Sequence, residues 1–184
     1  MTPLHDAFPA DGHTARWASW RGDASETLTL GWDNEGWTAS GVVEGPDVHY
    51  VVRLSPLWQV RQLLLFRDLD DPDLWLGTDG HGRWGEMNGT HRVDLDGGID
   101  VGLAITPFSY AMPIRRMVLD IGDEAPTVML EIDVETLGVV PVAHVVRRLA
   151  IDRYEFAQSA DDATTIVVDE HGLPLDVEGR FRRR

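Results

Sequence analysis

Two residue types are missing from this 184-residue sequence: it contains no cysteine, and its 16 basic residues are all arginines, so it also lacks lysine. The absence of cysteine excludes disulfides, thiol nucleophiles and thiolate metal sites. The absence of lysine excludes catalysis through a lysine Schiff base. The first residues, 1–20, have neither the basic start nor the apolar stretch of a signal peptide. No apolar run approaches the roughly 20 residues of a membrane-spanning helix, and we expect a cytoplasmic protein without a membrane span.

Positive charge is also scarce. The sequence has 31 Asp and Glu residues against 16 Arg, which gives a formal net charge of -15. Such a charge repels the phosphates of nucleic acids and anionic membrane surfaces, so we expect no nucleic acid partner. The content of hydrophobic residues, 43%, and of charged residues, 26%, is typical of a globular protein. We expect one domain over residues 1–184, in which residues 1–14 could be flexible.

Short segments with the composition of β-strands, separated by glycine, proline, Asp and Asn, are the dominant pattern. Their close spacing predicts an antiparallel meander and then two hairpins; the segments are 25–32, 36–45, 48–55 and 58–66, with hairpins over 74–87 and 164–177. The run 106–120 also reads as a strand. Helical periodicity is weak, and the best candidate is a short turn near residues 133–140. The sequence predicts an all-β fold with little helix.

The two predicted hairpins indicate an internal repeat. A shift of 90 residues without a gap places Asp79 on Asp169 and His81 on His171. A constant offset over most of a chain is the signature of duplication. We expect two repeats of about ninety residues, 1–92 and 93–184, related by a pseudo-two-fold axis. They would share one curved antiparallel sheet that forms a barrel or half-barrel, and a barrel of about eight strands can enclose a small ligand.

Motifs of catalysis and metal binding are weak. His81 and His171 lie in D-x-H-G bends, but no second ligand stands at a recognised spacing, and hairpin geometry explains them better. The segment 94–100, DLDGGID, lacks the glycine and glutamate positions of a calcium loop. No serine nucleophile elbow or paired carboxylate signature occurs. We expect no metal, no cofactor and no enzymatic activity; an enzyme for a small hydrophobic substrate and a structural domain without a ligand remain the alternatives.

Several arginines lie among apolar residues of predicted strands, chiefly Arg61, Arg115 and Arg116. Such an arginine must pair with a carboxylate, reach water or face a polar cavity, because an isolated buried charge is very costly. Internal pairing is the leading alternative to ligand binding, because 31 carboxylates are available. The seven tryptophans all lie within residues 17–84. They suit a hydrophobic core, and secondly a wall on which sugar rings stack.

Four segments together resemble a known family: DGHGRW, DLDGGIDVGLAITPFSYAMPIRRM, IDRYEF and VVDEHGLPLDVEGRFRR. Over residues 15–184 the chain is similar to the glycolipid-binding family, formerly a family of unknown function found mainly in bacteria. The resemblance implies a β-rich, pseudo-duplicated, barrel-like fold similar to periplasmic lipoprotein carriers, and a role in binding a glycolipid or other lipid-like molecule. The chain departs from the family pattern at Gly98, where cysteine is frequent, and at Tyr110, where asparagine is common.

The predicted function is therefore binding of an amphipathic small molecule, a lipid or glycolipid, in a barrel cavity. We expect one of Arg115 and Arg116 to face the cavity and hold an anionic or polyhydroxyl headgroup, because the planar guanidinium suits phosphate, carboxylate and sugar hydroxyls. The other would pair with a carboxylate at the surface. The complete set of predicted ligand-binding residues is Arg115, Arg116, Arg61, Trp58, Tyr110 and Trp84. The sequence leaves the oligomeric state open.

Overall fold

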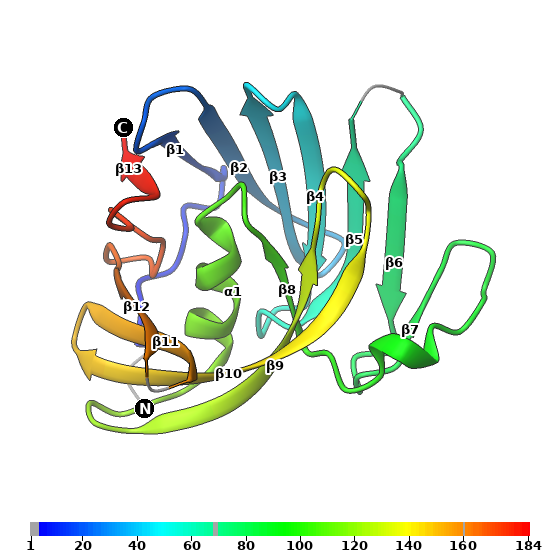
Figure 1. Ribbon diagram of the computed structural model, residues 1–184. Helices are drawn as coiled ribbons and strands as arrows, with labels where there is room; N and C mark the ends of the chain where they lie inside the picture. Colours follow the sequence, from blue (N-terminus) through cyan, green and yellow to red (C-terminus); the bar gives the residue numbers. More distant parts are fainter. Residues whose placement is uncertain (1–3, 68–69, 160) are drawn as a thin grey trace.

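The computed structural model describes residues 4–67, 70–159 and 161–184. Within these ranges the chain forms thirteen strands, one α-helix and one short 3-10 helix, η1, at Val93–Leu95. The fold is all-β, as the sequence predicts (Figure 1). Neither helix is long and apolar enough to cross a membrane within the part of the chain that the structure describes.

Sheet A is antiparallel and has eight strands in the order β13-β1-β2-β3-β4-β5-β6-β7. Its central strands form the predicted meander. Apolar residues alternate with polar ones on each of them, which is the pattern of a strand with one buried face. The bounds of its strands are β1 His13–Ser19, β2 Ser25–Asp33, β3 Gly36–Glu44, β4 Val48–Leu54, β5 Val60–Phe66, β6 Leu74–Thr78, β7 Trp84–Gly85 and β13 Phe181–Arg183.

Sheet B has five strands in the order β12-β11-β10-β9-β8, and its long strands β9 and β10 curve around one side of the molecule as a half-barrel (Figure 1). Its strands are β8 Asp100–Leu103, β9 Glu124–Ile132, β10 Val139–Ala150, β11 Arg153–Ser159 and β12 Asp162–Val167. One pair departs from the antiparallel pattern: β8 runs parallel to β9. A parallel pair needs a crossover connection, and the helix α1 between these strands supplies it.

Helix α1 spans Phe108–Arg116 and lies on the concave side of sheet B (Figure 1). The interpretation of residues 106–120 as a strand is therefore wrong. Six of its nine residues are buried, so the segment has no broad polar face to produce a helical period, and Pro113 lies inside it although proline normally disfavours a helix interior. The predicted short turn near residues 133–140 is confirmed as the β9–β10 turn, where Leu137 donates from its backbone nitrogen to the carbonyl oxygen of Asp133.

Two hydrophobic clusters lie on opposite sides of α1. The larger cluster fills the space between sheet A, β8, β9 and one side of α1, and includes Phe108 and Met112. The smaller cluster joins the other side of α1, with Ile114, to the concave face of sheet B. The helix thus holds the two sheets together. Close packing also reaches the backbone of sheet A at Gly41, where an added Cβ would collide with the ring of Tyr50.

The N-terminal segment packs against the same core. Phe8 is buried, and its ring lies 5.4 Å from that of Trp37 and 5.7 Å from that of Trp58, between centroids. Asp6 donates from its backbone nitrogen to the carbonyl oxygen of Glu170. The expected flexibility of residues 1–14 does not extend to this packed part, and residues 1–3 lie outside the described residues.

Two runs of four strands show the same antiparallel order, β3–β6 in sheet A and β9–β12 in sheet B. Trp37 lies opposite Leu54 in the first run, and Thr127 lies opposite His144 in the second, which is the same pairing after a shift of 90 residues. Strand β8 and helix α1 follow a different path from the corresponding residues of the first half. The duplication of the whole chain stays a prediction, to be tested by superposing residues 51–89 on 141–179.

Candidate functional site

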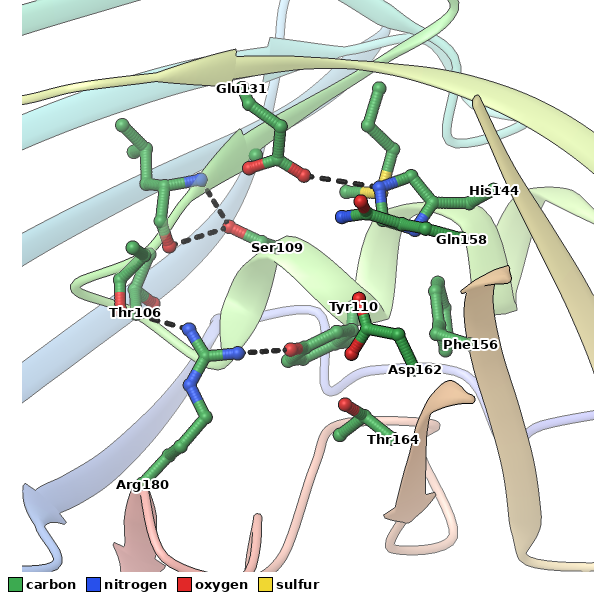
Figure 2. Close-up of a pocket in the computed structure, with 14 residues that line it drawn as sticks. Thr106, Ser109, Tyr110, Glu131, His144, Phe156, Gln158, Asp162, Thr164 and Arg180 are labelled. Atoms are coloured by element: carbon green, nitrogen blue, oxygen red, sulfur yellow. Dashed lines mark hydrogen bonds and ion pairs between the residues drawn. The ribbon is translucent and has the colours of Figure 1, made fainter. Parts of the chain in front are cut away.

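A polar pocket of about 260 Å³ lies between α1 and the concave face of sheet B (Figure 2). Alternate residues of a strand point into the pocket together, because residues two apart on a strand share a face. Met129 and Glu131 are such a pair on β9. Four further side chains come from β11 and β12, where Phe156 lies directly opposite Thr164. The labelled residues that line the pocket are Thr106, Ser109, Tyr110, Glu131, His144, Phe156, Gln158, Asp162, Thr164 and Arg180.

Tyr110 lies in the middle of the pocket and is held by Arg180, which comes from the C-terminal segment (Figure 2). Arg180 donates from Nη1 to the hydroxyl oxygen of Tyr110 at 2.6 Å and from Nη2 to the carbonyl oxygen of Ala104 at 3.4 Å. Burial raises the pKa of Tyr110 above its ordinary value; Arg180 opposes this, while Glu131 and Asp162 add to it. The phenol is therefore neutral at physiological pH and can donate its proton to an acceptor in the pocket.

Glu131 and His144 form a second polar pair on the wall made by β9 and β10. The Nε2 atom of His144 lies 3.2 Å from Oε1 of Glu131. His144 is nearly buried, whereas a third of the Glu131 side chain is exposed. In Figure 2 the Glu131 carboxylate points into the pocket beside the amide of Gln158. The pair thus presents one carboxylate to any molecule bound there.

A buried acid lies behind the pocket wall. Glu26 on β2 accepts hydrogen bonds at Oε1 from the hydroxyl of Tyr50, at 2.5 Å, and from that of Thr106, at 2.8 Å. Its other oxygen, Oε2, has no hydrogen-bond partner among the described residues. Burial raises the pKa of Glu26 to about 7, although both hydrogen bonds act in the opposite direction. Thr106 joins this acid to the pocket that it lines.

An apolar groove of about 610 Å³ adjoins the pocket at the β9–β10 turn. The two share Ala104 and Glu131 as lining residues. The groove is lined mainly by apolar side chains, those of Ala104, Ile105, Ile132, Val134 and Val140, and its other lining residues are Glu131, Asp133, Glu135, Thr136 and Gly138. Val140 is 57% exposed, so the groove presents apolar surface to water directly beside the polar pocket.

The six residues that the sequence predicts to bind a ligand lie in different parts of the structure. Tyr110 lines the polar pocket. Arg61 is exposed and donates to the carbonyl oxygen of Asp79 at 3.4 Å. Trp84 is buried and donates from Nε1 to the carbonyl oxygen of Gly98 at 2.9 Å. The binding roles of the set stay predictions, but the residues do not meet in one cavity.

Arg115 and Arg116 diverge at the end of α1. The guanidinium of Arg115 lies 4.5 Å from the ring centroids of both Phe8 and Trp58, and it donates to the carbonyl oxygen of His171. Trp58 is thereby part of the packing around a cation. Two aromatic faces and a carbonyl oxygen thus surround the guanidinium of Arg115, while its buried Nε atom has no hydrogen-bond partner among the described residues.

Arg116 pairs with Asp100 through two hydrogen bonds, from Nε at 3.1 Å and from Nη2 at 2.6 Å. Asp100 is fully buried, so the expectation of a surface carboxylate is wrong for this arginine. Thr127 donates to the same carboxylate at 2.7 Å. Arg116 also lines a second hollow of about 360 Å³ with Gln59 and Thr78. Internal pairing, the alternative that the sequence left open, applies here.

Sequence reasoning missed most of the pocket. Glu131, His144, Gln158, Asp162 and Arg180 come from four strands and the C-terminal segment, and no local spacing joins them. Their convergence depends on the curvature of sheet B. The burial of Glu26 could have been predicted from the sequence, because Glu26 shares a strand face with Leu28 and Leu30, which are buried.

Fold and site together define an all-β half-barrel with a polar pocket beside an apolar groove. The model of the family described as "Putative glycolipid-binding" matches residues 14–183, and the chain belongs to this family. The crystal structure of a DUF1089 family protein from Pseudomonas aeruginosa has a similar fold, with a TM-score of 0.71 and 24% identity over 96% of this chain and 94% of that chain. No curated protein sequence matches the chain at a significant level.

Proposed function

We propose that the protein binds the sugar headgroup of a glycolipid, or of a similar amphiphile, in the polar pocket, with the apolar tail in the adjoining groove. The observation that carries this proposal is the sharing of Ala104 and Glu131 between a polar pocket and an apolar groove. A molecule with a polar head and an apolar tail matches both surfaces at once. The family description points to the same class of ligand.

The pocket offers what a sugar ring requires. Sugar hydroxyls both donate and accept hydrogen bonds, and the pocket presents carboxylates on Glu131 and Asp162 together with the amide of Gln158. Phe156 also lines the pocket, but it is buried and packs edge-on against the ring of Tyr110, so the half-buried Tyr110 supplies the aromatic surface beside a sugar. The volume of about 260 Å³ is at the small end for a ligand site, so a tail has to lie outside it.

The groove suits an alkyl chain. A tail placed along Ile105, Val134 and Val140 would remove apolar side chains from water, which is favourable.

The proposal is for binding without turnover. The hydroxyl of Ser109, which lines the pocket, accepts a hydrogen bond from the backbone nitrogen of Leu103 and donates one to the carbonyl oxygen of Leu103. That engagement leaves it poorly placed to act as a nucleophile.

Octyl β-D-glucoside, kept below its micellar concentration, is a suitable probe for calorimetric titration. We expect the parent protein to bind it and Tyr110→Phe to bind it about fivefold more weakly, because the variant loses one hydrogen bond worth about 1 kcal/mol. Tyr154→Phe is the matched control: Tyr154 also loses a hydroxyl, but that hydroxyl contacts His5 rather than the pocket. Tryptophan fluorescence is a poor readout because no tryptophan lines the pocket.

Two results would contradict the proposal. The first is the absence of any heat of binding when the parent protein is titrated with the glucoside, which would remove the ligand class. The second is equal affinity of the Tyr110→Phe and Tyr154→Phe variants for the glucoside, which would remove the pocket as the binding site.

A further inference from the structure

We infer that the N-terminal segment, residues 4–12, is an acid-sensitive strap. At neutral pH it closes the space between α1 and sheet B at the C-terminal end of the helix, and it is released when histidines beneath it take up protons. The inference stands apart from the proposed function, because the pocket lies at the other end of α1. It is carried by three histidines that lie close to two arginines without a carboxylate partner.

The strap contacts the C-terminal end of α1 through an aromatic ring; in Figure 1 it is the blue trace that leads to β1. Phe8 is buried, and its ring centroid lies 4.5 Å from Cζ of Arg115. The ring centroids of His13 and His171 lie 5.1 and 5.0 Å from that of Phe8, and 4.9 Å from each other. Phe8 therefore packs among two imidazoles and a guanidinium.

The strap also contacts β11 and the hairpin that follows β12. Nε2 of His5 lies 3.2 Å from the hydroxyl oxygen of Tyr154 on β11. The backbone nitrogen of Asp6 donates to the carbonyl oxygen of Glu170 at 2.8 Å. Tyr154 shares a strand face with Phe156, which lines the pocket. Release of the strap would therefore uncover the face of β11 that leads to the pocket.

The charges of two arginines beside the histidines are not balanced by a carboxylate in contact. Arg115 donates from Nη1 to the carbonyl oxygens of His171 and Asp6, and its buried Nε has no hydrogen-bond partner among the described residues. Arg148 is buried, and its guanidinium donates to three carbonyl oxygens, those of Leu119, Ala150 and Ile151. Every histidine that takes up a proton here adds a charge of the same sign as the two arginines.

The acids around the strap do not offset this added charge. Asp169 is paired with Arg183 at 3.0 Å and accepts from backbone nitrogens of its own turn. Asp6 and Glu170 are exposed, so water weakens their attraction for a buried cation. Nε2 of His13 is buried, and a proton at this atom finds no acceptor among the described residues. The closed strap therefore favours neutral histidines.

These surroundings lower the pKa of two of the histidines. Burial, and then Arg115 and Arg148, lower the pKa of His5 from 6.5 to about 4, against the opposite effect of an exposed carboxylate on the strap. Burial, and then His171, lower the pKa of His13. A released strap regains the ordinary pKa values, so release becomes more favourable as the pH falls from 6.5 towards 4. After allowance for the partial exposure of its ring, His5 alone raises the released fraction about tenfold between pH 7.5 and pH 5.

Amide hydrogen exchange measures this release directly. The reporter is the amide of Asp6, which is bonded to Glu170 only while the strap is closed. Its protection factor, taken against the intrinsic exchange rate at each pH, gives the ratio of closed to open strap. We expect this factor to fall about tenfold or more from pH 7.5 to pH 5. The amide of Leu137, which donates to Asp133 in the β9–β10 turn, should keep its protection within about twofold.

His5→Gln removes the imidazole next to Tyr154 and should reduce the fall in protection at Asp6 to about threefold, with the remainder coming from His13. His81→Gln is the matched control, because His81 is an exposed histidine of the other hairpin bend. This control should keep the full fall. Circular dichroism at both pH values shows whether the strands stay folded.

Four outcomes would overturn the inference: no protection of the Asp6 amide at pH 7.5, protection that does not change with pH, an equal fall in the parent protein and in His5→Gln, or an equal fall at Leu137, which would indicate general unfolding. None of them bears on the binding of the glucoside, which is measured at neutral pH with the strap closed.

Discussion

Replacing Arg116 with methionine is expected to lower the free energy of unfolding by about 3–5 kcal/mol, the cost of leaving a buried charge without its partner. Asp100 is fully buried and receives two hydrogen bonds from Arg116 and one from Thr127. Without the guanidinium, the carboxylate keeps only the hydroxyl of Thr127. Urea denaturation followed by circular dichroism measures the effect.

Arg147→Met is the matched control for this loss. Arg147 also pairs with carboxylates, those of Glu124 and Glu155, but 46% of its side chain is exposed. An exposed pair contributes less than about 1 kcal/mol. The double variant Arg116→Met with Asp100→Leu should recover most of the stability, because removing both charges leaves no unpaired charge and only the hydroxyl of Thr127 loses its partners. Equal losses in Arg116→Met and Arg147→Met would contradict the structure at this site.

Glu26 is expected to make the protein less stable at pH 8 than at pH 4.5, by about 3 kcal/mol from this group alone. Its pKa in the folded protein is about 7, above its ordinary value of 4.5, so the folded state holds the proton more tightly than the unfolded chain. That contribution is fully present below about pH 4.5 and is lost as the pH rises through 7. Each pH unit between the pKa values of Glu26 in the folded and unfolded states corresponds to about 1.4 kcal/mol of stability.

Glu26→Gln isolates this contribution, because the amide does not titrate. The difference in unfolding free energy between the variant and the parent should move in favour of the variant by about 3 kcal/mol from pH 4.5 to pH 8. Glu44→Gln is the control: Glu44 is an exposed acid on the neighbouring strand β3, and its replacement should leave the pH profile parallel to that of the parent. A parallel profile for Glu26→Gln as well would show that the acid is not buried as described.

The strands of sheet A could be predicted from the sequence, and helix α1 could not. Alternation of apolar and polar residues is a local signal, and it places β2 to β5 within one or two residues of their bounds. In α1 the burial of residues on several sides removes the helical period, and Pro113 suggests an extended chain. The helix forms because the two clusters around it bury its side chains, and this tertiary packing is invisible to a local pattern.

The partners of the two central arginines lie beyond local prediction for the same reason. Arg115 contacts the ring of Phe8 and the carbonyl oxygen of His171, which are far from it in sequence. A sequence pattern could show that these cations need partners, but not which ones the fold supplies. The pocket likewise depends on the curvature of β9 to β12, which brings Glu131 and Asp162 into the same pocket as Tyr110.

The central claim is that the pocket beside α1 holds the headgroup of an amphiphile, and mapping of backbone amide chemical shifts by NMR during titration with octyl β-D-glucoside tests it most directly. The account predicts the largest shifts at Tyr110, Glu131, Gln158 and Thr164, all of which line the pocket. Shifts confined to the separate hollow beside Arg116, or no saturable shift at any residue, would contradict it.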